Sequence, residues 1–312
     1  MPSFAFFEKK FVPFSDAKIS VMTHAFNYGT AVFEGIRGNW NAEEEQLYLF
    51  RVKEHYQRLL NSCRILKINI PYTVDDLCRL TIDLVKMNEH RDDVYIRPLA
   101  YKSSAVIGVK LHDLQDELVI FTAALPAYLD VSGARCQTSS WRRIDDTMVP
   151  ARAKVTGLYV NSALAKTEAN ENGFDEAIML TYDGHVSEGS GENIFMVEKG
   201  HLVTPPSSDN ILVGITRDTV IQLAKIELGI ETIERSVDRS ELYVAEECFM
   251  TGTAAHVTPI IEIDRRKVGN GKIGPTTARL QELYFDVVRG KNKKYADWCT
   301  AVYPALSKVH TS

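Results

Sequence analysis

The N-terminal half of the chain mixes helical patterns with short runs typical of strands. In the window 53–66, apolar residues recur at the spacing of one helical face, at Tyr56, Leu59, Leu60, Cys63 and Leu66. A second helix is expected from about Thr73, a candidate N-cap that follows Pro71, to about Glu89. Runs rich in β-branched and aromatic residues predict strands at 5–7, 30–37, 46–50, 93–100 and 117–123.

The C-terminal half, from about Gly133 onward, has the same mixture, and the sequence contains no internal repeat. Strands are expected at 177–181, 193–197, 201–204, 247–251 and 257–263. Helices are expected at about 157–169, 216–228 and 275–288. Because both halves combine strands with helices, the pattern predicts the α+β fold class.

The length of 312 residues favours two domains over one. We expect an N-terminal α/β domain over residues 1–124, an inter-domain loop over 125–132 and a C-terminal domain over 133–312. The proposed loop, LPAYLDVS, follows a predicted strand and contains Pro126. The same run could equally be an ordinary loop within one domain.

Composition and charge narrow the class of protein. With 45% hydrophobic and 25% charged residues the chain is typical of globular proteins, and its net charge of −5 argues against a nucleic-acid partner. The five cysteines are widely spaced without a CxxC pair, so the sequence suggests neither disulfides nor a metal site. The chain lacks a signal-peptide pattern and any membrane-length apolar run, so we expect a cytoplasmic protein without a membrane partner.

Two charged residues stand in settings that could support catalysis. Lys154 lies among small and apolar neighbours in VPARAKVTGLY, where a lysine has a lowered pKa and becomes a usable nucleophile. From this context alone, an ordinary solvated lysine is the more common case. Glu188 precedes two glycines in EGSGEN, which we expect to be a loop. It could be a surface charge, or the acid that keeps a pyridine nitrogen protonated.

Three further segments could bind an anion. Arg58 lies off the apolar stripe of its helix, where it could bind a phosphate or simply face solvent. In GITRD (214–218), a glycine precedes a helix start that Thr216 could cap, and such a start is a ready phosphate site. TGTAAH (251–256) is a turn of small residues, which is either a plain connection between strands or a place where a ligand approaches backbone N–H groups.

Seven segments occur in an order and at spacings that match one enzyme family. They are HAFNYGTAVFEGIRG (24–38), EHYQRL (54–59), YIRPL (95–99), VPARAKVTGLY (149–159), SEGSGENIF (187–195), GITRD (214–218) and MTGTAAHVTP (250–259). Through them the chain, from about Phe11 to Arg289, resembles the branched-chain aminotransferases of the D-amino-acid-aminotransferase-like fold, fold type IV. The resemblance implies a two-domain fold and pyridoxal 5'-phosphate (PLP) as the cofactor.

The resemblance also implies a role for each matching residue. Lys154 matches the Schiff-base lysine and general acid–base, Glu188 the acid at the pyridine nitrogen, and Tyr159 the group beside the 3-oxygen. The phosphate cup is matched by Arg58, Ile215, Thr216 and Thr253. The substrate carboxylate site is matched by Tyr95, buttressed by Arg97, and by the backbone N–H groups of Ala254 and Ala255. The apolar side-chain pocket is matched by Tyr28, Phe33, Tyr128 and Gly191, with Arg37 at its edge.

The implied activity is transamination of L-leucine, L-isoleucine and L-valine with 2-oxoglutarate, by a homo-oligomer that is a dimer or a dimer-based hexamer. Rivals within the fold are enzymes acting on D-amino acids or (R)-amines and a 4-amino-4-deoxychorismate lyase. The absence of histidine between Arg91 and Leu111 argues against the D-amino-acid enzymes, and the IRP and GTAA motifs argue against the lyase. A non-catalytic binding protein would not need Lys154, Glu188 and Arg58 together.

One feature departs from the family pattern. Many bacterial relatives carry a tryptophan in the inter-domain loop, whereas the matching stretch here, ALPAYLD, is shorter and has none. We therefore expect looser closure of that loop and a wider range of apolar or aromatic substrates.

Overall fold

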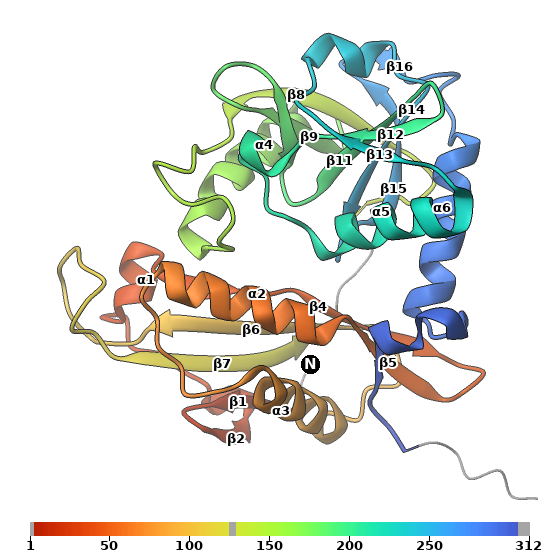
Figure 1. The fold of residues 1–312 in the computed structure, drawn as a ribbon. Helices are drawn as coiled ribbons and strands as arrows, with labels where there is room; N and C mark the ends of the chain where they lie inside the picture. The colour runs from red at the N-terminus through yellow and green to blue at the C-terminus, as the bar shows by residue number, and fades with distance from the viewer. Residues whose placement is uncertain (1–2, 125–128, 305–312) are drawn as a thin grey trace, which may run out of the picture. The chain divides into compact units, whose positions relative to one another are not determined.

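The computed structural model describes residues 3–124 and 129–304, which form two compact units. The first unit contains residues 3–124 and those from Phe285 to 304, and the second runs from 129 to Tyr284. Figure 1 shows a β-sheet with helices packed against it in each unit. The predicted α+β fold class is therefore confirmed. The predicted inter-domain loop, 125–132, lies partly outside the described residues.

The first unit is built on an antiparallel sheet. Its strands are β1 (Phe4–Phe7), β2 (Lys10–Pro13), β3 (Ala31–Phe33), β4 (Ile36–Asn41), β5 (Gln46–Phe50), β6 (Val94–Lys102), β7 (Asp116–Ala123) and β17 (Cys299–Ala301). They pair in the order β17-β5-β4-β6-β7-β1-β2, with β3 also on β6. Its helical elements are η1 (Phe14–Asp16), α1 (His24–Tyr28), α2 (Val52–Ile65), α3 (Val74–Met87) and η5 (Lys293–Trp298).

The two longer helices of this unit form where the hydrophobic pattern predicts them. On α2 the residues Val52, Tyr56, Leu59 and Cys63 are buried, and they include most of the predicted apolar stripe. Helix α3 begins at the predicted N-cap, because the Thr73 side chain and Asp76 form a reciprocal capping box. Burial of these apolar faces fixes α2 and α3 on the sheet.

The second unit is built on a mixed sheet. Its strands are β8 (Ala134–Arg142), β9 (Glu176–Leu180), β10 (Val186–Gly189), β11 (Asn193–Glu198), β12 (His201–Thr204), β13 (Thr232–Glu234), β14 (Glu247–Gly252), β15 (His256–Ile263) and β16 (Arg266–Lys267). They pair in the order β10-β9-β8-β15-β14-β11-β12-β13, with β16 also on β15. The pairs β8/β9, β8/β15 and β12/β13 are parallel.

The helical elements of the second unit are η2 (Thr156–Leu158), α4 (Tyr159–Glu171), η3 (Ser207–Asp209), α5 (Ile215–Leu228), η4 (Arg239–Tyr243) and most of α6 (Pro275–Val288). Helix α4 packs on β8 and β9, and α5 packs on β13 and β14. Strands β9, β11 and β14 are buried on both faces, which explains their nearly continuous apolar sequences.

The end of the described chain belongs to the first unit, although we expected it in the C-terminal domain. The boundary falls within α6, and the residues from Phe285 onward are grouped with the N-terminal sheet. Strand β17 pairs with β5, and the backbone N–H groups of Val302 and Tyr303 donate to Gln46 Oε1 at 3.1 and 2.8 Å. A strand of three residues has no periodicity to reveal its partner, so the sequence pattern misplaced this segment.

The predicted elements also differ from the structure at other places. The run 30–37 is not one strand but two, β3 and β4, separated at Glu34 and Gly35. Strand β8 was not predicted, since its sequence ARCQTSSWR is largely polar. The stretch EGSGEN is not a loop throughout, because Glu188 lies on β10 and Asn193 begins β11.

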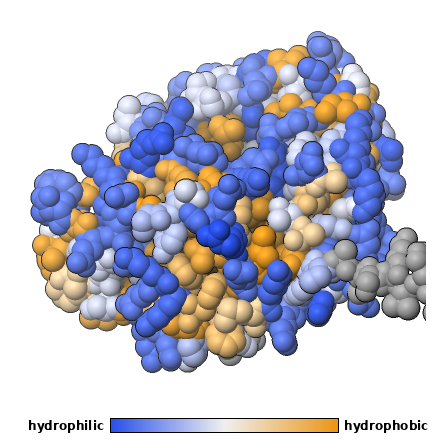
Figure 2. All heavy atoms as spheres, turned by 60° about the horizontal axis from the view of Figure 1, so that its bottom comes forward, coloured by the Kyte–Doolittle hydropathy of each residue, from blue (hydrophilic) through white to orange (hydrophobic). Residues whose placement is uncertain are grey.

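Hydrophobic side chains are also exposed at several places on the surface. Figure 2 shows them in patches separated by hydrophilic residues on one face of the molecule. In the first unit, the most exposed large apolar residues belong to two segments, 19–28 and 106–109, and include Val21, Phe26, Ile107 and Val109. Among the residues that the structure describes, no helix is long and apolar enough to cross a membrane.

Candidate active site

Lys154 lies beside a tyrosine at the start of a helix in the second unit. The chain leaves β8, passes Lys154, forms the turn η2 and enters α4 at Tyr159. Lys154 Nζ donates a hydrogen bond to Tyr159 Oη at 2.5 Å. The neighbouring Ala153 and Val155 are buried, so the amine emerges half-buried from an apolar segment, as the sequence indicated. This local fold sets an amine and a phenol side by side.

Glu188 is anchored on β10 by three donors. Its Oε1 lies 2.7 Å from a terminal nitrogen of the Arg143 guanidinium. Its Oε2 accepts hydrogen bonds from Asn193 Nδ2 at 3.0 Å and from the backbone N–H of Leu212 at 3.1 Å. Both members of the Arg143–Glu188 pair are buried. A buried carboxylate that pairs with a guanidinium and accepts from two N–H donors is fixed in one orientation, which suits an acid that supports a protonated ring nitrogen.

Asn193 lies between the Glu188 carboxylate, to which it donates, and the start of helix α5. The helix begins at Ile215 with Gly214 as its N-cap, so the prediction that Thr216 caps it is wrong, and Thr216 lies in the first turn. A Cβ on Gly214 would lie 2.1 Å from Asn193 Oδ1, so any larger residue would force the Asn193 side chain to shift. The first turn of a helix presents N–H groups and a positive dipole end, which suits an anion.

The small-residue turn joins β14 to β15. Gly252 pairs with His256, so Thr253, Ala254 and Ala255 form the connection between the strands. His256 has a φ of 57°, a left-handed conformation that lets the chain reverse tightly. Thr258 Oγ1 donates to the Ala255 carbonyl at 2.6 Å and fixes the end of the turn.

In the first unit, the predicted substrate residues that lie on strands β3, β4 and β6 share one face of the sheet. Arg37 on β4 pairs directly with Tyr95 on β6, so their side chains lie on the same side. Arg97 donates to Tyr95 Oη from Nε at 3.1 Å and from a terminal nitrogen at 2.8 Å, and its guanidinium lies 4.3 Å from the centre of the Phe33 ring. A Cβ on Gly35 would lie 2.4 Å from Tyr95 Oη, so glycine makes room for the phenol.

Three other described residues were predicted to form the side-chain pocket or its edge, and each has different neighbours. Arg37 contacts Asp93 Oδ2 at 3.3 Å, and its Nε is buried without a hydrogen-bond partner among the described residues. Tyr28 on α1 packs on the His24 ring and accepts from the backbone N–H of Gly108. Gly191 lies between β10 and β11 with open space where a Cβ would be. Tyr128 lies outside the described residues.

Arg58 completes the set of predicted site residues. On α2 it donates two hydrogen bonds to Glu34, from Nε at 2.7 Å and from a terminal nitrogen at 2.8 Å. It belongs to the first unit, whereas Lys154, Glu188 and Thr216 belong to the second, so the candidate residues come from both units.

Comparison with known proteins identifies the family. A family model described as amino-transferase class IV matches residues 31–263. The chain belongs to the aminotransferase class IV family. Over 301 residues it is 54% identical to the probable branched-chain-amino-acid aminotransferase of Aquifex aeolicus, covering 96% of this chain and 97% of that relative. Over 300 residues it is 40% identical to the branched-chain-amino-acid aminotransferase of Pseudomonas aeruginosa, covering 95% and 96%.

Solved structures of class IV relatives are similar over nearly the whole chain. The branched-chain aminotransferase from Thermoproteus uzoniensis with norvaline has a TM-score of 0.93 and 45% identity, covering 97% of this chain and 100% of that one. The branched-chain amino acid aminotransferase from Thermobaculum terrenum, in its PLP-form, has a TM-score of 0.92 and 40% identity, covering 97% and 99%. The resemblance indicated by the seven sequence segments is therefore confirmed.

The structure of this class IV aminotransferase adds residues that the sequence analysis had not singled out. Arg143 and Asn193 hold Glu188, while Glu34 and His55 contact each other and Glu34 holds Arg58. Asn193 and Glu34 stand within segments that match the family, so those motifs offered a signal. Arg143 follows the unpredicted strand β8 and had none.

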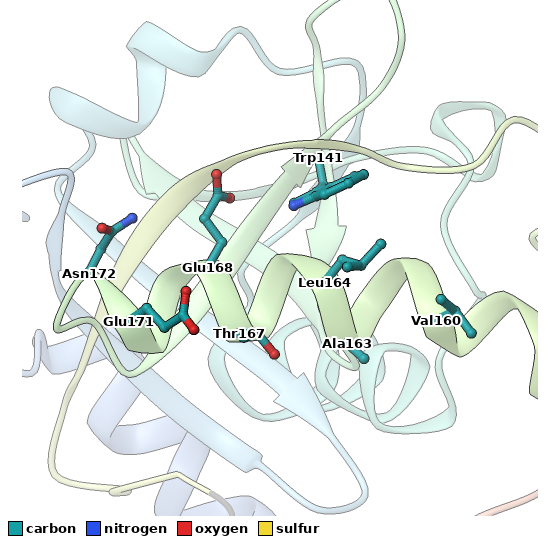
Figure 3. A pocket seen from close by; sticks show the side chains of 8 residues that line it. All are labelled: Trp141, Val160, Ala163, Leu164, Thr167, Glu168, Glu171 and Asn172. Atoms are coloured by element: carbon teal, nitrogen blue, oxygen red, sulfur yellow. The ribbon is translucent and has the colours of Figure 1, made fainter.

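A surface hollow lies elsewhere on the second unit. It has a volume of about 530 Å³ and is lined by Trp141, Val160, Ala163, Leu164, Thr167, Glu168, Glu171 and Asn172. Figure 3 shows the Trp141 ring above α4, with the side chains of Leu164 and Glu168 below and beside it. None of the predicted cofactor or substrate residues that the structure describes lines this hollow, so we assign it no part in the chemistry.

Proposed function

We propose that this class IV aminotransferase transfers the amino group between L-leucine, L-isoleucine or L-valine and 2-oxoglutarate, giving branched-chain 2-oxo acids and L-glutamate with PLP as cofactor. The observation that carries the proposal is the pairing of Lys154 with Tyr159 in the unit where Arg143 anchors Glu188. The relatives agree, because the Thermobaculum terrenum enzyme was solved in its PLP-form and another relative with 4-methylvaleric acid, which has the carbon skeleton of leucine without its amino group.

The residues of this chain fit PLP, which supplies an electron sink for the bond changes at the amino acid Cα when it is bound. The anchored Glu188 carboxylate suits the pyridine nitrogen, and Tyr159 Oη suits the 3-oxygen. For the phosphate we assign the α5 start with Ile215 and Thr216, Thr253 in the β14–β15 turn, and Arg58. Glycine at 214 is consistent with this assignment, since it lets Asn193 reach both Glu188 and the helix start.

Lys154 is the residue that we assign to proton transfer. Its Nζ would hold the cofactor, and as a free amine it would be the group that carries the proton. A free amine at this place could take the proton from the substrate Cα and hold it for return. The hydrogen bond from Nζ to Tyr159 Oη restricts where the amine can lie, so it keeps the base oriented for both transfers.

Substrate recognition requires a site for the α-carboxylate and a pocket that accepts both an apolar branched chain and the second carboxylate of the acceptor. We assign the α-carboxylate to Tyr95 Oη, which Arg97 orients, and to the backbone N–H groups of Ala254 and Ala255. The side-chain pocket is assigned to Phe33, Gly191, Tyr28 and Tyr128, because apolar contact stabilises a branched chain by about 0.8 kcal/mol per buried CH₂.

The acceptor must present a second carboxylate to the same pocket. Arg37 is the assigned partner, because its buried Nε has no hydrogen-bond partner among the described residues. A further branched-chain aminotransferase, solved in complex with N-(5'-phosphopyridoxyl)-L-glutamate, shows that a member of this family binds such an adduct.

The active form is proposed to be a homo-oligomer, either a dimer or a dimer-based hexamer. Two exposed apolar segments, 19–28 and 106–109, are held side by side in the first unit. His24 bonds to Thr30 Oγ1 and the Gly108 carbonyl, and Thr23 bridges to Ala105. An apolar patch that is so exposed, up to 91% at Val109, is typical of a face that another subunit covers.

Lys154→Ala tests the catalytic assignment. The purified protein should be yellow from bound cofactor, and the variant should lose both the visible absorption band and transamination while keeping the far-ultraviolet circular dichroism of the parent. Lys166→Ala is a matched control, since Lys166 is a partly buried lysine of the same unit whose Nζ pairs with Glu176. Full activity in Lys154→Ala would remove Lys154 from the mechanism.

A cytoplasmic location is also proposed. Cysteine residues 63, 78, 136, 248 and 299 are all unpaired, and four of them are buried, which suits a reducing compartment.

A further inference from the structure

Glu34 forms the centre of a buried polar cluster in the first unit. It lies in the break between β3 and β4, and its side chain has no exposed surface. Its carboxylate accepts hydrogen bonds from His55 Nδ1 at 2.7 Å and from two nitrogens of Arg58 at 2.7 and 2.8 Å. Because an ionised carboxylate only accepts, the hydrogen in the first bond must be carried by His55 Nδ1.

The charges in this cluster favour an ionised Glu34. Burial on its own raises the pKa of a carboxyl group, but the Arg58 charge and the hydrogen bonds from Arg58 and His55 outweigh burial. Together they hold the pKa of Glu34 well below its usual range. The pairing with Arg58 and His55 therefore favours the ionised form of Glu34.

The contact with Glu34 restrains the Arg58 side chain in two ways. Bonding through Nε and a terminal nitrogen fixes the plane of the guanidinium as well as its position, since the two parallel bonds act as a fork. His55, three residues earlier on the same face of α2, contacts the same carboxylate and prevents it from turning. The Arg58 side chain remains partly exposed, at 16%, while that of Glu34 is fully covered.

We propose that Glu34 and His55 are positioning residues for the cofactor phosphate, acting through Arg58. This inference rests on the proposed function, in which Arg58 binds that phosphate. A guanidinium that is already fixed loses less conformational freedom when an anion binds, so the anion binds more tightly. The break between β3 and β4 at Glu34 and Gly35 supports this role. It turns the Glu34 side chain toward Arg58 on α2, while Gly35 leaves room for Tyr95 Oη.

The test compares PLP with pyridoxal, which lacks the phosphate. Full-length protein is stripped of cofactor and titrated with each compound, and the dissociation constants are measured from absorbance for the parent, Arg58→Ala, Glu34→Gln and the double variant. Glu34→Gln should weaken PLP binding by about fivefold or more, within the range of coupling between contacting residues, and leave pyridoxal binding nearly unchanged. In the Arg58→Ala background, Glu34→Gln should add nothing.

Two further variants separate positioning from a general loss of structure. His55→Asn keeps a donor close to the place of Nδ1 and should retain PLP affinity, whereas His55→Leu removes the donor and should lose it. Asp116→Asn is the matched control, because Asp116 forms an ion pair with the buried Lys102 in the same unit, at 2.9 Å. It should lower stability without changing the ratio of the pyridoxal and PLP constants.

The outcomes distinguish this inference from the function on which it rests. If Arg58→Ala weakens PLP binding but Glu34→Gln does not, Arg58 keeps its role and the positioning proposal is overturned. Equal weakening of PLP and pyridoxal by Glu34→Gln would also overturn it, since that pattern marks a purely structural residue. If Arg58→Ala itself leaves PLP affinity unchanged, Arg58 is not a phosphate ligand, and both that assignment and the positioning proposal fall, while the Lys154 test of the proposed function is unaffected.

Discussion

The ion pair between Arg143 and Glu188 offers a direct test of how the site is held together. Arg143→Met removes the guanidinium but keeps an unbranched side chain. The two side chains are only 5% and 6% exposed and lie 2.7 Å apart. At an effective dielectric constant of about 20, two unit charges at this distance attract by roughly 6 kcal/mol. After desolvation is subtracted, breaking a buried pair on one side costs about 3–5 kcal/mol, because the remaining charge is left uncompensated.

The assay is a double-mutant cycle on the free energy of unfolding of cofactor-free protein, measured in urea. Arg143→Met should lose about 3–5 kcal/mol, because Glu188 is left as a buried charge. Adding Glu188→Gln removes that charge, so the double variant should recover stability, with a coupling of about 2 kcal/mol or more. The cycle also cancels the contacts of Arg143 with the Asn210 carbonyl and Ser162. Additive effects, with a coupling below about 0.5 kcal/mol, would show that Arg143 does not hold the Glu188 charge.

Three further predictions follow from the packing and charge of the two units. Gly214→Ala should cost about 1–3 kcal/mol of stability and weaken PLP binding, since its Cβ would lie 2.1 Å from Asn193 Oδ1; unchanged PLP affinity would count against the α5 start as a phosphate site. Burial, and then the nearby Glu176 charge, raise the pKa of Glu192 well above its ordinary value. The folded protein therefore keeps a proton that the unfolded chain releases, so its free energy of unfolding should fall as pH rises above about 5. Glu192→Gln should therefore gain stability relative to the parent at about pH 8 compared with about pH 5, and an equal difference at both values would contradict a neutral Glu192. Ile107→Asp should shift the protein toward monomers in light scattering, because it puts a charge on the exposed apolar face, whereas an unchanged mass would place the subunit interface elsewhere.

The local pattern of the sequence was sufficient where an element depends mainly on its own residues. The apolar stripe of α2 and the Thr73 cap of α3 are both determined within one helix, so their spacing predicts them. Strands β5 and β12 were predicted with the bounds observed, because short apolar runs between polar turns leave little choice.

Contacts between distant parts of the chain were not predictable in the same way. Glu188 lies on a buried strand because Arg143, 45 positions earlier in the numbering, compensates its charge, and nothing near Glu188 reveals that partner. Without a visible partner, an acid among glycines is more typical of a loop than of a strand interior. The same reasoning applies to β17, whose place is decided by β5 and Gln46 and not by its own three residues.

The central claim is that the enzyme prefers branched-chain L-amino acids as amino donors, and one assay tests it most directly. Purified, PLP-loaded protein is given a panel of L- and D-amino acids and (R)-amines with 2-oxoglutarate as acceptor, and glutamate formation is measured for each donor. L-Leucine, L-isoleucine and L-valine should be turned over fastest and at similar rates, because an apolar pocket distinguishes them from alanine by about 0.8 kcal/mol per CH₂ but scarcely from one another. Dominant turnover of D-alanine or of an (R)-amine, with L-leucine near background, would contradict the proposed substrate class.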